Sequence, residues 1–379
     1  MSAWMAAASS YSVSDVPMLP FFIYYSMFGF QRIGDLCWAA GDMRARGFLI
    51  GGTSGRTTLN GEGLQHQDGH SHLLAGAIPN CHAYDPTFAY EVAVILQDGV
   101  RRMLTEQEDA YWYVTVLNEN YAHPELPKGV EADIIRGMYL FRDGDDPLPE
   151  AAPGADAKSD PPGRKAPVIH ESDSAPANDS AGEKPKSAAK SRANAAAKTA
   201  KPSSAGKRRK SGPRVQLLGC GAILREVISA AELLEKEFGV VADIWSCPSF
   251  NELRRDGFDV ERWNRLHPLE KKPRTAHVTN CLADREGPVI AATDYVRAYA
   301  DQIRAFIPSG KQYVVLGTEG FGRSDTRAHL REFFEVDRHW IAHAAVSALA
   351  AEGTLKPADA ARALELWKLD PDKPNPTTV

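Results

Sequence analysis

The feature that most constrains the fold is a long segment of biased composition in the middle of the chain. Residues from about 143 to 213 are rich in Pro, Ala, Ser and Lys and hold almost no large apolar side chains. Such a segment cannot bury enough apolar surface to offset the entropy lost on ordering it. The sequence therefore predicts a long disordered linker over 143–213, with globular regions at 1–142 and 214–379.

The linker changes charge along its length. Its first part carries acids such as Asp143 and Asp145, and its second part ends in the basic run Lys207–Lys210. A basic run over 184–214 could bind nucleic acid or a localisation receptor. Globular sequence on both sides favours a solvated interdomain linker, and a net charge of -5 gives the chain no general attraction to nucleic acid or membranes. We therefore expect neither a nucleic-acid nor a membrane partner.

The first globular region reads as an α/β domain. Gly47–Gly51, Asn80–Tyr84 and Tyr111–Leu117 are apolar, aromatic or β-branched runs that predict strands, the last of them central. Asp85-Pro86 forms a turn that opens a helix with apolar residues at helical spacing. Val16–Phe30 is apolar but interrupted by prolines and too short to span a bilayer, so we expect a buried segment leading into a helix.

The second globular region shows the same alternation. Arg214–Gly219, Val240–Trp245, Val289–Ala292 and Tyr313–Gly317 predict strands, and 222–238 predicts a helix after the first of them. Alternating strands and helices imply mostly parallel sheets with right-handed crossovers. The sequence thus predicts two separate three-layer α/β domains.

The five cysteines indicate the compartment. They are widely spaced, odd in number and form no CxxC pair, so neither a disulfide framework nor a structural zinc site is indicated. No basic stretch precedes the apolar segment near the N-terminus, so we expect no signal peptide. A reducing, cytoplasmic location fits these features.

The densest polar cluster is the stretch Gly51–His72. It holds three histidines, two acids, an arginine and six glycines, and polar loops after buried strands are where α/β proteins place their sites. The histidines could bind a metal, and Gly51–Gly55 could cradle phosphate, but neither matches a known motif; a structural loop is the plainer reading for most of the glycines. For Glu62 and His66, four residues apart, we favour proton chemistry.

Two further segments have more than one interpretation. Pro20–Arg32 crowds aromatic side chains, which either pack in the core or offer an aromatic face and polar tips to a flat heterocycle. Gly317–Asp325 is glycine-rich and follows a strand but lacks a G-x-G-x-x-G pattern, so it either contacts a cofactor or caps the next helix.

Three strings carry a resemblance to a known family: Ile23–Leu36, Gly61–His72 and Gly317–Asp325. They resemble the homodimeric bacterial pyruvate dehydrogenase decarboxylating component, a thiamine-diphosphate-dependent member of the transketolase superfamily. The resemblance covers both globular regions and implies the C-terminal half of such a component. It makes 1–142 a pyrimidine-binding domain that lacks its first part, and 214–379 a transketolase C-terminal-like domain that contributes mainly to a dimer.

The resemblance also assigns roles to four residues. Phe28 matches the ring that stacks on the aminopyrimidine of the cofactor. Tyr25, Glu62 and His66 match polar residues at its substrate end. The implied activity is oxidative decarboxylation of pyruvate with acetyl transfer to a lipoyl group. His66 and Tyr25 suit the donor or acid that this chemistry needs at the substrate oxygen, and Glu62 would tune His66.

Two family elements have no match in this chain. The Gly-Asp-Gly motif and following Asn that hold Mg²⁺ and the diphosphate are not found, and by alignment the glutamate that activates the cofactor would lie just before Met1. The resemblance therefore implies a partial thiamine diphosphate site with no metal ligands of its own. Its expected partners are a complementary chain that supplies the diphosphate half with Mg²⁺, a lipoyl-bearing acyltransferase and further copies of itself. Such a chain would be inactive alone; the alternative is an inactive fragment that acts as a dimerisation or regulatory module.

Overall fold

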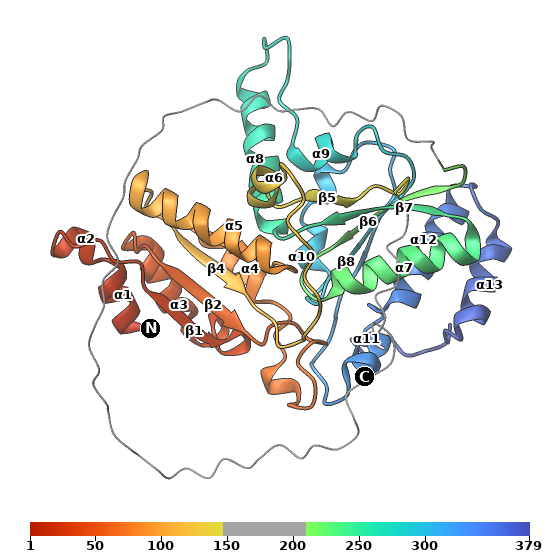
Figure 1. Ribbon diagram of the computed structural model, residues 1–379, viewed down its shortest axis with the longest axis horizontal. Helices are drawn as coiled ribbons and strands as arrows, with labels where there is room; N and C mark the ends of the chain where they lie inside the picture. Colours follow the sequence, from red (N-terminus) through yellow and green to blue (C-terminus); the bar gives the residue numbers. More distant parts are fainter. Residues whose placement is uncertain (147–209) are drawn as a thin grey trace. The chain divides into compact units, whose positions relative to one another are not determined.

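The computed structural model describes residues 1–146 and 210–379, which contain two sheets (Figure 1). All neighbours in the first sheet are parallel, and in the second only β5 runs antiparallel to its neighbour. The first sheet has the order β1-β2-β4-β3, with β1 (Phe21–Tyr25), β2 (Phe48–Gly52), β3 (Cys81–Tyr84) and β4 (Tyr111–Thr115). The second has the order β5-β7-β6-β8-β9, with β5 (Tyr139–Arg142), β6 (Arg214–Gly219), β7 (Val241–Ser246), β8 (Val289–Ala292) and β9 (Tyr313–Leu316).

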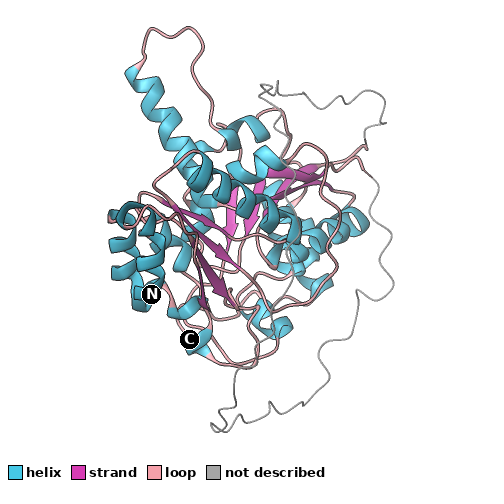
Figure 2. Ribbon diagram, turned by 60° about the vertical axis from the view of Figure 1, so that its left-hand side comes forward, coloured by secondary structure: helices cyan, strands magenta, loops and turns pink. Residues whose placement is uncertain are grey.

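Helices surround both groups of strands (Figure 2). Those before residue 147 are α1 (Ser2–Ala8), α2 (Ser10–Val13), α3 (Phe30–Asp42), α4 (Ser71–Gly76), α5 (Ala89–Val100) and α6 (Glu131–Arg136), with a π turn at Arg101–Thr105 and 3₁₀ turns at Ser26–Phe28 and Leu64–His66. Those after residue 209 are α7 (Ile223–Phe238), α8 (Phe250–Leu266), α9 (His277–Leu282), α10 (Ala298–Asp301), α11 (Arg327–Phe333), α12 (Arg338–Ala351) and α13 (Pro357–Trp367), with a 3₁₀ turn at Arg304–Phe306. None of the helices in these two ranges is long and apolar enough to cross a membrane.

Side chains close to the helix ends explain where several helices start and stop. The Glu91 carboxylate accepts the backbone N–H of Phe88 at 3.0 Å and so caps the start of α5. Asp337 accepts two N–H groups at the start of α12, each at 2.9 Å. Gly239 ends α7 with a φ of 64°, a left-handed conformation that glycine adopts at little cost.

Each sheet has apolar layers on both faces, as the strand pattern requires. In β4, Tyr111 and Tyr113 pack on the side of α1, α3 and α4, while Trp112 and Val114 pack on the side of α5 and α6. In the second sheet, Leu217 of β6 faces α7 and α12, and the next residue faces α8 and α9. Since successive side chains of a strand point to opposite faces, fully buried strands give three layers. The prediction of two three-layer, mostly parallel α/β sheets is confirmed, and β4 is an internal strand as expected.

The expected boundary at residue 142 does not separate the two sheets. Tyr139–Arg142, which we assigned to the first domain, forms β5 and pairs with β7 of the second sheet. Tyr139 remains linked to the first part of the chain because its hydroxyl donates to Glu91 at 2.7 Å. The four-residue strand is too short for its own sequence to indicate which sheet it joins.

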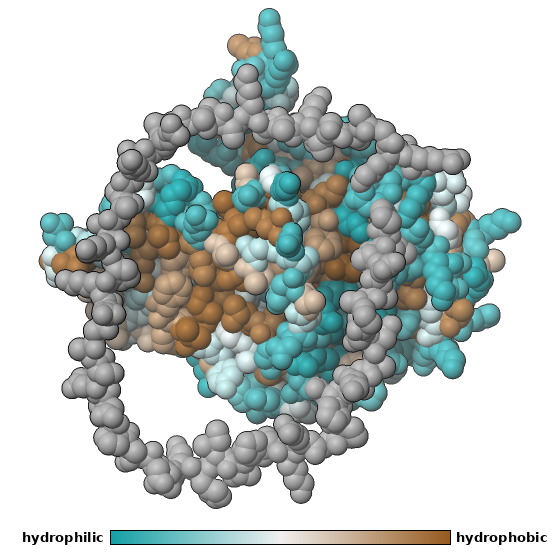
Figure 3. Space-filling view, in the orientation of Figure 1, coloured by the Kyte–Doolittle hydropathy of each residue, from teal (hydrophilic) through white to brown (hydrophobic). Residues whose placement is uncertain are grey.

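The expectation that Val16–Phe30 is buried is wrong for its strand. Phe21–Tyr25 forms β1 at the edge of the first sheet, with Phe21 52%, Ile23 71% and Tyr25 48% exposed. In Figure 3, apolar side chains gather on the face of the molecule where β1, β2 and β4 lie. Because Phe21, Ile23 and Tyr25 alternate along the strand, they point to one face of the sheet, and that face is incompletely covered at this edge.

The predicted linker is shorter at both ends than expected. The backbone N–H of Gly144 donates to Asp243 at 2.8 Å, and that of Lys210 donates to Asp145 at 2.9 Å. Lys210 also pairs with Glu235 of α7 at 2.6 Å. Residues 143–146 and 210–213 thus belong to the second sheet's surroundings, and the prediction for the remainder of the linker lies outside the described residues.

Polar contacts join the two sheets through groups distant in sequence. Asp294, just after β8, is buried and accepts the N–H groups of Thr57 and Thr58 at 2.8 and 3.1 Å and their hydroxyls at 2.7 and 2.6 Å. These bonds fix the loop after β2 against the carboxyl end of β8.

A second polar junction surrounds His82 of β3. Its Nδ1 lies 3.1 Å from Glu252 of α8, and its Nε2 lies 3.6 Å from Glu108. The guanidinium groups of Arg102 and Arg255 lie 2.9 and 3.2 Å from the two ring nitrogens. Burial lowers the pKa of His82, but the two carboxylates outweigh burial and leave the pKa raised above its usual value.

Candidate active site

A tight turn at the end of β1 places the first two candidate residues. Tyr25 ends the strand, Ser26–Phe28 forms a 3₁₀ turn, and Gly29 precedes α3. A Cβ on Gly29 would lie 2.2 Å from the ring of Tyr24, so only glycine permits this approach of the turn to the strand. This geometry points Phe28 toward the loop after β2.

The second two candidates lie on that loop and meet the first two. The ring centres of Phe28 and His66 are 4.8 Å apart, and that of Tyr25 lies 5.7 Å from His66 and 6.1 Å from Phe28, all in edge-to-face geometry. The Glu62 carboxylate lies 3.7 Å from Nδ1 of His66. The structure therefore brings all four sequence-predicted site residues together.

The cluster combines exposed and buried atoms in a way that suits proton transfer. Tyr25 is half exposed and His66 is partly buried. Nδ1 of His66 is buried and has no hydrogen-bond partner, although Glu62 is close. A small rotation would let the carboxylate accept a hydrogen bond from the N–H at this nitrogen, which would leave the opposite ring nitrogen to face a bound molecule. The guanidinium of Arg32 lies 4.7 Å from the centre of the Phe28 ring and adds positive charge beside the cluster.

Asp68 anchors the two halves of the cluster to each other. This buried carboxylate accepts the N–H groups of His70 and Ser71, each at 3.0 Å, and the side-chain amide of Gln31 at 3.3 Å. It also accepts the hydroxyls of Ser26 and Ser71. Since Ser26 begins the turn that carries Phe28, Asp68 ties that turn to the loop that carries His66.

The hydroxyl of Tyr113 completes this network from β4. It lies 3.0 Å from the hydroxyl of Ser26 and donates to that of Ser71 at 2.9 Å. The sequence indicated Tyr113 as a core residue only, and Asp68 as one acid among several. The sequence did show an acid in a polar loop and a tyrosine in a strand, but nothing in it indicated that the two would join one hydrogen-bond network.

The three histidines of Gly51–His72 do not converge on a metal. His72 is buried, its Nε2 lies 3.2 Å from the Thr115 hydroxyl, and burial lowers its pKa to about 3. His66 lies in the aromatic cluster, while the backbone of His70 binds Asp68. Across residues 1–146 and 210–379, no three His, Cys, Asp or Glu side chains are grouped to hold a metal ion.

Two glycines of the possible phosphate loop are explained by packing. A Cβ on Gly51 would lie 2.6 Å from the hydroxyl of Tyr113, and one on Gly55 would lie 2.2 Å from the carboxylate of Asp294. These glycines let the backbone approach side chains of the protein itself. The structural interpretation of these positions is confirmed.

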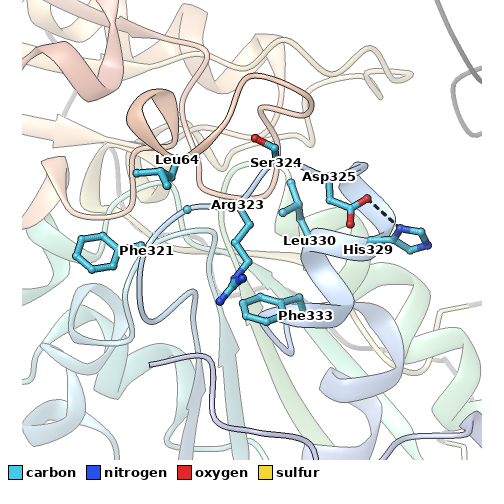
Figure 4. Close-up of a pocket in the computed structure, with 9 residues that line it drawn as sticks. Leu64, Phe321, Arg323, Ser324, Asp325, His329, Leu330 and Phe333 are labelled. Atoms are coloured by element: carbon cyan, nitrogen blue, oxygen red, sulfur yellow. Dashed lines mark hydrogen bonds and ion pairs between the residues drawn. The ribbon is translucent and has the colours of Figure 1, made fainter. Parts of the chain in front are cut away.

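The glycine-rich segment Gly317–Asp325 lies against the same loop and borders a pocket of about 550 Å³ (Figure 4). Thr326 accepts the N–H of His329 at 3.3 Å, so the segment also leads into the cap of α11, as one of the two interpretations expected. The pocket is lined by Leu64 from the loop after β2 and by Phe321, Gly322, Arg323, Ser324, Asp325, His329, Leu330 and Phe333.

Solved structures with a similar fold are transketolases. A transketolase from Campylobacter jejuni superposes with a TM-score of 0.54 at 14% identity, over 90% of this chain and 38% of that one. A chain of a split-gene transketolase, solved as an inactive beta4 tetramer, superposes with a TM-score of 0.51 at 13% identity, over 92% of this chain and 81% of that one. At such identities the likeness shows the fold, which is that of transketolase.

Sequence comparison shows which proteins the chain is similar to. The family of the pyruvate dehydrogenase E1 component middle domain matches residues 1–124, and that of the transketolase-like C-terminal domain matches residues 205–337. Pyruvate dehydrogenase E1 components from Cupriavidus necator, Pseudomonas aeruginosa and Escherichia coli are 54%, 52% and 47% identical over 99–100% of this chain. The chain is thus similar over its whole length to part of the pyruvate dehydrogenase E1 component. It spans about 35% of the length of these relatives.

Proposed function

We propose that the chain forms the pyrimidine side of a thiamine diphosphate site. Together with a second chain, it would catalyse the oxidative decarboxylation of pyruvate and the transfer of the acetyl group to a lipoyl group. The relatives that cover the whole chain are named as pyruvate dehydrogenase E1 components, which supports this activity. The observation that carries the proposal is the meeting of Tyr25, Phe28, Glu62 and His66 at the end of the first sheet.

These residues fit the flat end of the cofactor. The half-buried ring of Phe28 offers an apolar face, and Tyr25 adds a second aromatic ring with a hydroxyl. The buried Nδ1 of His66 has no hydrogen-bond partner within the described residues, which leaves the ring able to exchange a proton. Thiamine diphosphate, when bound, would supply the carbon centre that adds to the ketone of pyruvate and accepts the electrons released with CO₂.

The residues of this chain would then act on the substrate oxygen. His66 would donate a proton or hydrogen bond to the oxygen that becomes negatively charged, with Tyr25 as a second donor. Glu62, 3.7 Å from Nδ1 of His66, would stabilise the charged imidazole and select which ring nitrogen carries the transferable proton. The aromatic rings would exclude water from the reacting atoms.

The diphosphate and Mg²⁺ would be bound by another chain. The sequence holds no Gly-Asp-Gly motif for them, and the chain spans only about a third of its relatives' length. A split-gene transketolase of the same fold supports the idea that this part of the enzyme can be a separate chain. The proposed partners are therefore the complementary chain, further copies of this chain, and a lipoyl-bearing acyltransferase that accepts the acetyl group.

Reconstitution tests this proposal. The part of the Cupriavidus necator relative that this chain does not match would be expressed separately and mixed with it, with thiamine diphosphate, Mg²⁺, pyruvate and ferricyanide as an artificial acceptor of the two electrons. We expect CO₂ release from the mixture and from neither chain alone. His66→Ala should abolish that turnover, and His267→Ala, a control on the exposed end of α8, should not.

The outcomes separate the proposal from its alternative. Co-purification of a chain with a Gly-Asp-Gly motif from the native host, together with decarboxylation, would support a split enzyme. A homo-oligomer with no turnover in any mixture would instead indicate an inactive dimerisation or regulatory module. Turnover that His66→Ala leaves unchanged would remove His66 from the mechanism.

A further inference from the structure

We propose that the glycine-rich segment Gly317–Asp325 holds the loop of Glu62 and His66 in its working shape, with Gln67 as the positioning residue between them. The proposal rests on the function proposed for Glu62 and His66. It gives the second sheet a direct part in the site, beyond a role in dimerisation.

Gln67 connects the two segments through both ends of its amide. Its Oε1 accepts the backbone N–H of Arg323 at 2.6 Å, and its Nε2 donates to the carbonyl of Leu59 at 2.8 Å. The residue is 1% exposed, so both bonds are shielded from water. Because Gln67 directly follows His66, a shift of its side chain moves the backbone that carries the imidazole.

Gly322 makes this contact possible. A Cβ at this position would lie 2.5 Å from Oε1 and 2.8 Å from Cβ of Gln67, and 3.0 Å from Cα of Leu64. Any side chain at position 322 would therefore push Gln67 or the 3₁₀ turn away. The glycine serves the contact with the loop, since its φ is not in the left-handed region.

The same segment also holds the loop on the other side of His66. The N–H of Gly61 donates to the carbonyl of Asp325 at 3.3 Å, and a Cβ on Gly63 would lie 2.9 Å from the hydroxyl of Ser324. Further back, Arg56 donates to the carbonyl of Gly320 at 2.6 Å. Contacts thus precede Glu62 and follow His66, and the pair lies on the span between them.

This arrangement positions the pair and does not take part in the chemistry. Among the described residues, no hydrogen bond, ion pair or ring contact joins Gln67, Gly322 or Arg323 to the ring of His66, and the pocket of Figure 4 lies between the same two segments. A displacement of about 1 Å at a reacting group can cost about 100-fold in rate. We therefore expect loss of the contact to lower kcat by about 10- to 100-fold while the KM for pyruvate changes by less than about threefold.

The test uses Gly322→Ala in the full chain, with Gly34→Ala as the matched control because a Cβ on Gly34 meets nothing within 4 Å. Gln67→Met, which keeps the length of the side chain and removes both hydrogen bonds, serves if Gly322→Ala fails to fold. Amide hydrogen exchange of residues 59–69 is measured on the chain alone, where no activity is needed. Turnover and its pH profile are measured on the reconstituted enzyme beside His66→Ala.

We expect faster exchange over 59–69 in Gly322→Ala and Gln67→Met, unchanged exchange in Gly34→Ala, and a fall in kcat with an altered pH profile in the first two. Unchanged exchange in both variants would overturn the contact itself. Faster exchange with unchanged kcat and pH profile, in an enzyme that His66→Ala inactivates, would overturn the positioning role. If His66→Ala left the turnover of the reconstituted enzyme unchanged, the proposed function would fail, and this variant thereby distinguishes that failure from a failure of the positioning role.

Discussion

Replacement of Asp68 tests how the candidate site is held together. Asp68→Ala removes the acceptor of two backbone N–H groups, those of His70 and Ser71, and of the hydroxyls of Ser26 and Ser71. The hydroxyls can turn to Tyr113, which lies within 3.0 Å of both. The two N–H groups have no such alternative among the described neighbours.

The expected magnitude follows from those two donors. A buried donor left without a partner costs about 1–3 kcal/mol, so two such donors should make Asp68→Ala lower the free energy of unfolding by about 2–6 kcal/mol. Asp68→Asn keeps one oxygen for the N–H groups, and its amide can donate to the serine hydroxyls. We therefore expect Asp68→Asn to cost less than about 1.5 kcal/mol.

Urea unfolding of the two variants, followed by tryptophan fluorescence, measures the difference. Asp35→Ala, on the exposed side of α3, is the control and should change the free energy of unfolding by less than about 0.5 kcal/mol. If Asp68→Ala cost no more than Asp68→Asn, the orphaned N–H groups would not be the source of the loss, and the reasoning would fail.

Three other perturbations have definite signs. The pKa of His82 is raised beside Glu252 and Glu108, so the stability that protonated His82 contributes is complete below about pH 6.5 and is lost as pH rises through the folded pKa. The difference in unfolding free energy between the wild type and His82→Gln should therefore shrink as pH rises, which urea titrations from about pH 5 to 9 would show. Burial raises the pKa of Asp85 to about 7, so ionisation of Asp85 lowers the stability of the folded protein increasingly between about pH 4 and 7. The unfolding free energy of Asp85→Asn should therefore rise relative to that of the wild type over this range, and a pH-independent difference would contradict this. The apolar edge strand β1 should make the isolated chain associate with itself. Ile23→Lys, which replaces a side chain that is 71% exposed, should weaken this association at least about tenfold in sedimentation velocity. A monodisperse wild-type monomer would contradict the idea.

Local sequence was enough to predict most of the strands, but not β1, the strand that carries Tyr25. The residues of β6 were predicted as they stand, because a short run with three aliphatic residues that ends in glycine depends only on neighbours in the chain. Glu62 and His66 could be paired because they are four residues apart on a polar loop. Tyr25 and Phe28 were assigned from the resemblance to a family, and the structure places them against His66.

The contacts that shape the site could not be predicted in this way. Asp294 binds residues more than 230 positions earlier in the chain, and Gln67 meets Arg323 across 256 positions. Such pairs form only when the two sheets pack together, and the periodicity of a local sequence does not indicate how the sheets pack.

The sequence by itself determined two α/β sheets, all of their described strands except β1 and β5, and a polar loop with an acid beside a histidine, because hydrophobic spacing and turn residues act over a few positions. The tertiary structure alone decided that β1 lies at an edge with its apolar side chains exposed, that β5 joins the second sheet, and that Gly322 faces Gln67. A side chain's burial and partners are set by whichever elements pack beside it, and that depends on the whole chain at once.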